Sequence, residues 1–116
     1  MEINKDAKLL RIFIGESDKY HGRPVYENIV LKAREFGLAG ATVTKGIMGF
    51  GANSKIHTAK LLTLSEDLPI VIEIVDNLEK IEQFIPVVNQ IFESANIGGL
   101  VTIEKAEIIK YTSNKK

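Results

Sequence analysis

Apolar and polar residues alternate with a period of two over residues 8–15, and this pattern predicts a β-strand. One face of the strand carries Leu10, Ile12 and Ile14, and the other carries Leu9, Arg11 and Phe13. The same alternation predicts a strand over residues 68–75, with Ile70, Ile72 and Ile74 on one face. Shorter runs predict strands over 40–47 and 100–104, and a short fifth strand over 107–111.

Two segments carry apolar residues at the spacing of an amphipathic helix. The first begins at Pro24, which suits the first helical turn, and ends before Gly37, which is expected to act as a C-terminal cap. Its apolar positions are Val25, Tyr26, Ile29, Val30, Ala33 and Phe36. The second begins at Asp76 and Glu79, a pair with capping-box spacing, and Pro86 near its middle is expected to kink or split it.

In chain order these elements read β-α-β-β-α-β, which is the order of the ferredoxin-like fold. The fold class is therefore α+β, with two helices on one face of a four-stranded antiparallel sheet and a single domain over 1–116. A long loop is expected over about 49–66, and a tail over about 112–116. The uncovered face of the sheet carries Leu9 and Phe13, which favours association with other copies.

A chain of 116 residues with 45% hydrophobic and 26% charged residues has the composition of a globular protein. Its 15 basic residues balance its 15 acidic residues, so the net charge gives no reason to expect a nucleic acid partner. Cysteine is absent, which excludes disulfides, thiolate metal sites and a cysteine nucleophile. No apolar run approaches the roughly 20 residues that span a bilayer, and residues 1–6 show no signal-peptide pattern. We therefore expect a cytoplasmic protein without membrane insertion.

A glycine-spaced turn over 46–51 follows the predicted strand and opens the long loop. Such a turn exposes backbone N–H groups at the end of a sheet, where an anionic ligand can bind. The charge pattern agrees, because residues 36–65 contain no aspartate or glutamate. The basic residues of this stretch are Lys45, Lys55, His57 and Lys60. The alternative is a hairpin with an ordinary loop, which the glycines alone explain equally well.

The residues of this region closely resemble the PII signal-transduction proteins. The shared motifs are Gly40-Ala41-Thr42-Val43-Thr44, Gly49-Phe50-Gly51 and Leu68-Pro69-Ile70-Val71-Ile72-Glu73-Ile74-Val75. The chain is still more similar to the PII-like group called domain of unknown function 190. The motifs that carry this likeness are Gly15-Glu16, Gly22-x-Pro24, Gly37-Leu38-Ala39-Gly40-Ala41-Thr42-Val43, Leu64-Ser65-x-Asp67-Leu68-Pro69 and Gly99-Leu100-Val101-Thr102.

PII proteins are homotrimers that bind adenine nucleotides in clefts between subunits, and their T-loop engages channels, enzymes or regulators. The resemblance implies a homotrimeric regulator that binds AMP, ADP or ATP and relays it to a membrane transporter or an enzyme. It also implies that Thr42 contacts the base and that Gly49, Phe50 and Gly51 lie against the phosphates. Gly98 and Gly99 stand at the second phosphate turn, but the lysine that follows it in PII proteins is missing. A less charged nucleotide than ATP would suit such a site better.

Several polar residues have both a functional and an ordinary interpretation. Lys45 is a candidate phosphate contact or a solvated lysine, and Lys55, His57 and Lys60 are partner contacts or ordinary loop residues. Arg11 is expected to pair with Glu73 or Glu104 between copies in a trimer.

An alternative to the signalling protein is a CutA-like trimer that handles metal ions or serves as a scaffold without nucleotide switching. Glu16, Asp18 and His21 match no metal-ligand spacing, so no metal ligands are expected among them. A catalytic pair would have to come from Ser54 and His57 in a loop, which is a poor place for preorganisation. We therefore expect neither an enzyme nor a covalent cofactor.

Overall fold

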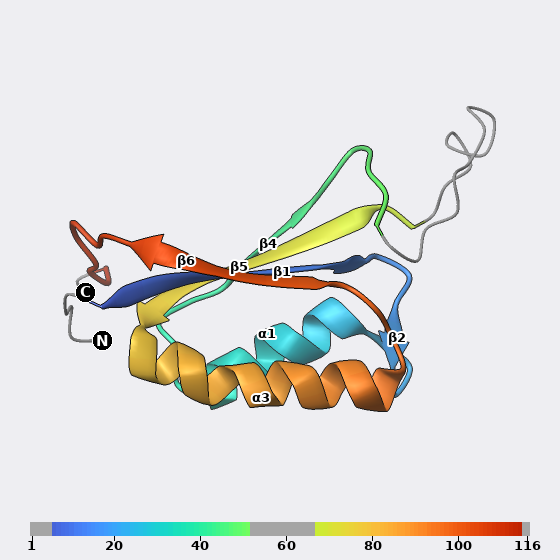
Figure 1. Cartoon of the computed structure of the whole chain (residues 1–116), viewed down its shortest axis with the longest axis horizontal. Helices are drawn as coiled ribbons and strands as arrows, with labels where there is room; N and C mark the ends of the chain where they lie inside the picture. The colour runs from blue at the N-terminus through green and yellow to red at the C-terminus, as the bar shows by residue number, and fades with distance from the viewer. Residues whose placement is uncertain (1–5, 52–66, 115–116) are drawn as a thin grey trace.

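The computed structural model describes residues 6–51 and 67–114, and it contains a four-stranded sheet covered on one face by two helices (Figure 1). The elements are β1 (Ala7–Gly15), β2 (Lys19–Tyr20), β3 (Arg23–Pro24), α1 (Val25–Glu35), β4 (Thr42–Lys45), β5 (Pro69–Asn77), α3 (Leu78–Ala95) and β6 (Leu100–Ala106). The strand order of the sheet is β4-β5-β1-β6, and each neighbouring pair is antiparallel. The predicted ferredoxin-like architecture is confirmed.

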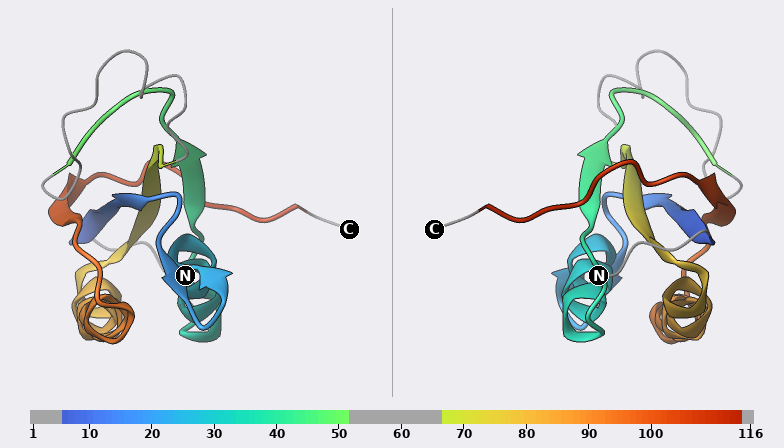
Figure 2. Two further views of the ribbon diagram at one scale, coloured as in Figure 1. Left: turned by 90° about the vertical axis from the view of Figure 1, so that its right-hand side faces the viewer. Right: turned by 90° about the vertical axis from the view of Figure 1, so that its left-hand side faces the viewer.

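The core lies between the sheet and the helices. Alternation places Leu10, Ile12 and Ile14 of β1 on the helix side, where each is at most 5% exposed. Their neighbours on β5 are Ile70, Ile72 and Ile74, which are also buried. From below, α1 contributes Val25, Ile29 and Ala33, and α3 contributes Ile81, Phe84, Val88 and Ile91. Both views in Figure 2 show the two helices side by side under one face of the sheet, with the opposite face uncovered by any helix.

Two strand predictions are longer than the observed strands. β4 spans only Thr42–Lys45, and it ends beside Pro69, the first residue of β5, which has no N–H to donate. The predicted fifth strand over 107–111 is wrong. Ala106 already lies opposite Ala7, the first residue of β1, so no described strand extends far enough to pair with the residues that follow.

The two helices confirm one prediction from the sequence and correct two others. Gly37 follows α1 with φ of 82°, the left-handed conformation of a C-terminal cap. The capping box at Asp76 is wrong, since Asn77 is the N-cap of α3 and no side chain caps it. The helix also continues unbroken through Pro86, which is exposed, so the carbonyl freed one turn earlier can face water. No helix in the described part of the chain is long and apolar enough to cross a membrane.

Asp76 is instead the last residue of β5 whose side chain faces the helices, and it is 2% exposed. Its carboxylate accepts hydrogen bonds from the backbone N–H of Asn77 at 2.6 Å and of Ala39 at 2.9 Å. Asp76 therefore ties the start of α3 to the segment that leads into β4. A buried carboxylate with two backbone donors is well satisfied, and the loss of either donor would be costly.

The connector before α1 contains a short hairpin formed by β2 and β3. Its turn uses His21 with φ of 52° and Gly22 with φ of 76°. Two successive positive φ values are typical of a type I′ turn, for which Gly22 was the available sequence signal. The backbone carbonyl of Asp18 accepts the N–H of Val25 at 2.8 Å and closes the base of the hairpin, while the Asp18 carboxylate accepts the N–H of Gly15, at the end of β1, at 2.9 Å.

Asp18 makes the stability of this end sensitive to pH. Burial raises the pKa of its carboxyl, the hydrogen bond from the Gly15 N–H lowers it, and the nearby Asp67 carboxylate raises it, with a net rise above the ordinary 3.8. A folded-state pKa above the unfolded one means that stability falls as pH rises through the interval between them. We expect Asp18→Asn, which keeps an acceptor for Gly15, to gain stability relative to the wild type as pH increases. Urea denaturation at several pH values measures this, and a pH-independent difference would contradict it.

Candidate functional site

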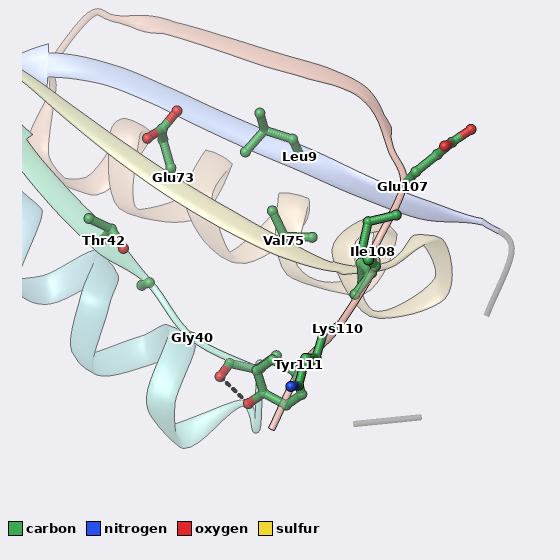
Figure 3. A pocket seen from close by; sticks show the side chains of 12 residues that line it. Leu9, Gly40, Thr42, Glu73, Val75, Glu107, Ile108, Lys110 and Tyr111 are labelled. Carbon is green, nitrogen blue, oxygen red and sulfur yellow. Dashed lines mark hydrogen bonds between the residues drawn. The ribbon is translucent and has the colours of Figure 1, made fainter. Parts of the chain in front are cut away.

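A cavity of about 690 Å³ lies on the uncovered face of the sheet, at the end where β1 begins and β5 ends (Figure 3). Leu9, Glu73 and Val75 form its floor. One wall is the segment 39–42 that leads into β4, and the other is the segment 107–111 that follows β6. The cavity therefore lies between parts of the chain that are distant in sequence.

Strand register brings the floor residues together. Leu9 of β1 lies directly opposite Val75 of β5, and Glu73 of β5 lies opposite Thr42 of β4. All four side chains share the face of the sheet that the helices leave open, because residues at even separation along a strand point to the same side. The cavity thus has an apolar part at Leu9 and Val75 and a polar part at Thr42 and Glu73.

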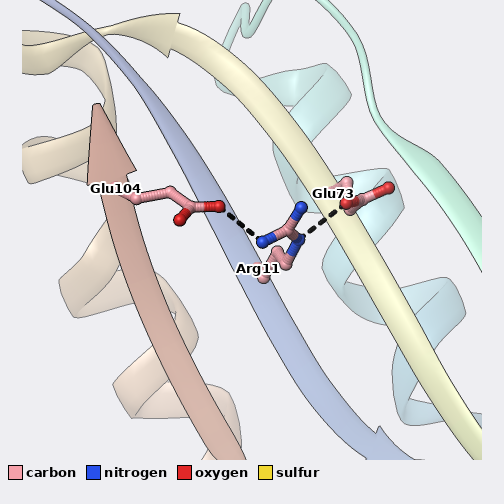
Figure 4. A network of polar contacts seen from close by, with 3 residues as sticks. All are labelled: Arg11, Glu73 and Glu104. Carbon is pink, nitrogen blue, oxygen red and sulfur yellow. Dashed lines mark hydrogen bonds and ion pairs between the residues drawn. The ribbon is translucent and has the colours of Figure 1, made fainter. Parts of the chain in front are cut away.

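Glu73 belongs to an ion-pair network on the same face (Figure 4). The Arg11 guanidinium contacts Glu73 Oε2 through Nε at 2.7 Å and Glu104 Oε1 through Nη1 at 2.5 Å. The hydrogen bond with Glu73 and the charges of both carboxylates raise the pKa of Arg11, against a smaller lowering by desolvation. These pairs form within one chain rather than between copies as expected. One guanidinium shared by two carboxylates leaves the network with a net charge of −1, so Arg11 compensates Glu73 only in part beside the apolar surface of the floor.

The wall at 39–42 is fixed from two directions. The backbone N–H of Ala39 donates to the buried Asp76 at 2.9 Å, and its carbonyl accepts from Tyr111 Oη at 2.6 Å. Figure 3 shows the tyrosine ring reaching this carbonyl from the opposite wall. The peptide at Ala39 therefore connects the core with both walls of the cavity.

Of the predicted ligand residues, only Thr42 lines this cavity. Lys45 shares its face of β4 with Val43, on the opposite side from Thr42. Its ammonium pairs with Glu16 Oε2 at 3.1 Å, and its side chain is 53% exposed. The structure thus gives Lys45 a carboxylate partner at the end of β1.

The glycine turn after β4 packs against the start of β5. Gly46 donates its N–H to Pro69 O at 2.7 Å, and a Cβ at Gly46 would lie 2.7 Å from Pro69 Cγ. A Cβ at Gly49 would lie 3.0 Å from the same atom. The two glycines therefore allow a close approach to the proline ring, while Phe50 is 83% exposed and Gly51 is exposed.

Gly98 and Gly99 lie at the same end of the sheet but at its other edge, before β6. A Cβ on Gly99 would lie 2.5 Å from Phe13 O and 2.9 Å from the Phe92 ring, so packing alone requires glycine there. Two strands separate β6 from β4, which places the two turns about 14 Å apart at the usual strand spacing. One chain alone therefore does not bring them together.

The remaining predicted contacts, Lys55, His57 and Lys60, lie outside the described residues. Sequence reasoning missed the roles of Val75 and Tyr111 as cavity residues, and it treated Leu9 only as a contact between copies. The signal for Leu9 and Val75 was their apolar character on the uncovered face. Nothing in the local pattern around Tyr111 points to Ala39, which lies 72 residues away.

The fold has solved structural neighbours. CPII from Thiomonas intermedia K12, in a structure bound to ADP and bicarbonate, superimposes with a TM-score of 0.64 at 17% identity, covering 90% of this chain and 89% of that one. A second CPII structure from the same organism, bound to ADP, AMP and acetate, gives a TM-score of 0.62 at 16% identity and covers 93% of this chain and 94% of that one. At this identity the likeness establishes the PII fold.

Sequence comparison gives the family. A UPF0166 protein of Aquifex aeolicus is 40% identical over 102 residues, which are 88% of this chain and 92% of that protein. A UPF0166 protein of Methanocaldococcus jannaschii is 35% identical over 104 residues, which are 90% of this chain and 93% of that protein. The model of the DUF190 family (Uncharacterized ACR, COG1993) matches residues 7–108. The chain therefore belongs to the DUF190, or UPF0166, family.

Proposed function

We propose that this protein is a PII-like regulator that binds an adenine nucleotide with the base in the cavity beside Thr42. One observation carries the proposal: the threonine that the PII resemblance assigns to the base lines a cavity of about 690 Å³. The floor of that cavity offers apolar side chains for the faces of a ring and polar groups for its edge. The CPII structures with ADP and AMP show that related architecture takes such ligands, which supports the assignment.

The phosphates would extend along β4 toward the glycine turn. From Thr42 to Gly46 is four residues, or about 13 Å of extended strand, and Gly46 begins the turn that includes Gly49 and Gly51. Backbone N–H groups of such a turn favour an anion. A base at Thr42 and a phosphate at the turn would make the ligand parallel to the edge strand.

We propose that the nucleotide is bound between copies of a homotrimer. The turns at Gly49 and Gly99 lie on opposite edges of one sheet, so a single chain cannot offer both to one phosphate group. A closed ring that places the β4 edge of one copy near the β6 edge of the next would do so. The part of the uncovered face around Phe13, outside the cavity, would be the surface buried at the centre.

The charges near the glycine turns favour a nucleotide with few phosphates. Lys45 is paired with Glu16, and no lysine follows Gly99 directly. A terminal phosphate of ATP would therefore lack the usual lysine partner. By charge alone, AMP or a cyclic nucleotide matches this site better than ATP, and ADP lies between them.

Ligand binding would be relayed through the loop after β4 to a membrane transporter or an enzyme, and the protein itself would not be a catalyst. Ile47, Met48 and Phe50 at the start of this loop are 96%, 72% and 83% exposed. Three exposed apolar side chains in four residues form a contact surface suited to a protein partner. Contacts that a nucleotide makes with only one arrangement of the turn would shift the population toward that arrangement.

A thermal-shift panel with ATP, ADP, AMP, cyclic AMP and divalent metal ions tests the proposal. We expect a saturable rise in Tm with AMP that is at least as large as the rise with ATP at equal concentration. A ligand at a hundred times its Kd stabilises the folded state by about 2.7 kcal/mol, which such a panel detects easily. The absence of any nucleotide effect would contradict nucleotide binding, and a rise with metal ions alone would favour the CutA-like alternative. A rise with ATP but not with AMP would contradict the expected charge preference.

A further inference from the structure

The segment Glu107–Tyr111, here called the strap, leaves the edge of the sheet instead of extending β6. Figure 2 shows the chain crossing the uncovered face from β6 toward the β4 side after that strand ends. The strap has no strand partner among the described residues, yet it provides one complete wall of the cavity. Leu9 and Val75 are partly exposed beneath the strap, and removal of this wall would expose them further.

The strap is held weakly compared with the opposite wall. Ile109 is 89% exposed and Tyr111 is 44% exposed, and the described attachment to the opposite wall is the hydrogen bond from Tyr111 Oη to Ala39 O at 2.6 Å. An exposed hydrogen bond of this kind competes directly with water, so it can break and reform at little cost. Its acceptor does not move in the same way, because Asp76 fixes the Ala39 peptide to the core. The contact joins a movable segment to a fixed one.

The strap does not fill the space beneath it, since the cavity retains about 690 Å³. Building on the proposed function, we infer that the strap is a closing wall: it opens to admit the nucleotide and closes over the base, with Tyr111 as its latch. Ile108, which is partly buried, lies in the same wall and would contact the bound ring. A ligand that touches both the floor and the strap stabilises the closed arrangement, because those contacts exist only when it is closed.

The test uses Tyr111→Phe, which removes the donor and keeps the ring. We expect AMP to dissociate from the variant about two- to tenfold faster than from the wild type, with little change in association. AMP should slow the exchange of the backbone amides of residues 107–111 in the wild type, and with AMP bound these amides should exchange faster in the variant than in the wild type. Tyr26→Phe removes a hydroxyl on α1, away from the cavity, and should leave both measurements unchanged.

The possible results distinguish a failure of the closing role of the strap from a failure of nucleotide binding. If AMP protects 39–42 and 73–75 but not 107–111, or if Tyr111→Phe releases AMP at the wild-type rate, the closing role is overturned and nucleotide binding stands. If the wild type shows no nucleotide-dependent protection in any part of the chain, the proposed function fails and the strap fails with it. Faster release and faster exchange in Tyr111→Phe alone, with Tyr26→Phe unchanged, is the result that the closing wall requires.

Discussion

Replacement of Thr42 by phenylalanine is expected to abolish nucleotide binding while leaving the fold intact. Thr42 is exposed, its side chain shares the cavity face of β4, and an aromatic ring there would occupy the space proposed for the base. We expect affinity for AMP to fall by about tenfold or more, which corresponds to at least 1.4 kcal/mol of binding energy. The free energy of unfolding should change by only about 0.5 kcal/mol, because the position is solvent-facing and aromatic residues suit strands. Isothermal titration calorimetry measures the first quantity and urea denaturation the second.

The matched control is Thr42→Ser at the same position. Serine keeps the hydroxyl and removes one methyl group, so the cavity stays open and AMP should bind within a few-fold of the wild-type affinity. Equal binding by Thr42→Phe and the wild type would place the nucleotide elsewhere. A loss of binding accompanied by a large loss of stability would mean that Thr42 supports the fold rather than the ligand.

Asp76→Ala is expected to be the most destabilising substitution of a polar residue in the described structure. The change leaves the N–H groups of Ala39 and Asn77 without their carboxylate acceptor in a site where Asp76 itself is 2% exposed. Each buried donor left unpaired costs about 1–3 kcal/mol, so the total loss for the two donors should be about 2–6 kcal/mol. The urea midpoint should fall with little change in its m-value.

Asp67→Ala provides the control, because Asp67 also accepts a backbone hydrogen bond, from Ser17 at 3.1 Å, but is exposed. Water can replace that acceptor, and the expected loss is about 1 kcal/mol or less. Asp76→Ala should in addition weaken AMP binding, since the wall at Ala39 loses its tie to the core. Equal losses of stability in the two variants would contradict the anchoring role of Asp76.

Local patterns predicted the fold because its main elements bury one face each. The alternation around Leu10 and Ile72 identified β1 and β5, and Gly37 marked the end of α1 through its positive φ. The errors occurred where a distant residue determines the outcome. Asp76 resembles a helix cap in sequence, but the approach of Ala39 from another segment makes it a buried acceptor instead.

The candidate site was only partly predictable for the same reason. Thr42 was identified through a motif, and the apolar character of Leu9 on the uncovered face was visible in the alternation. The strap was not predictable, because residues 107–111 have the apolar composition of a short strand but no strand partner at that position. The sequence left Lys45 open between a phosphate contact and a solvated lysine, because no local rule reveals that Glu16, 29 residues away, pairs with it.

A crystal structure of the protein bound to AMP tests directly whether the nucleotide occupies the cavity beside Thr42. We expect a purine lying over Leu9 and Val75, with its edge toward Thr42 and its phosphate toward the turn at Gly49. Tyr111 should remain bonded to Ala39 above the base. A crystal in which AMP occupies another surface, or in which the cavity beside Thr42 stays empty at a concentration that saturates binding in solution, would contradict it.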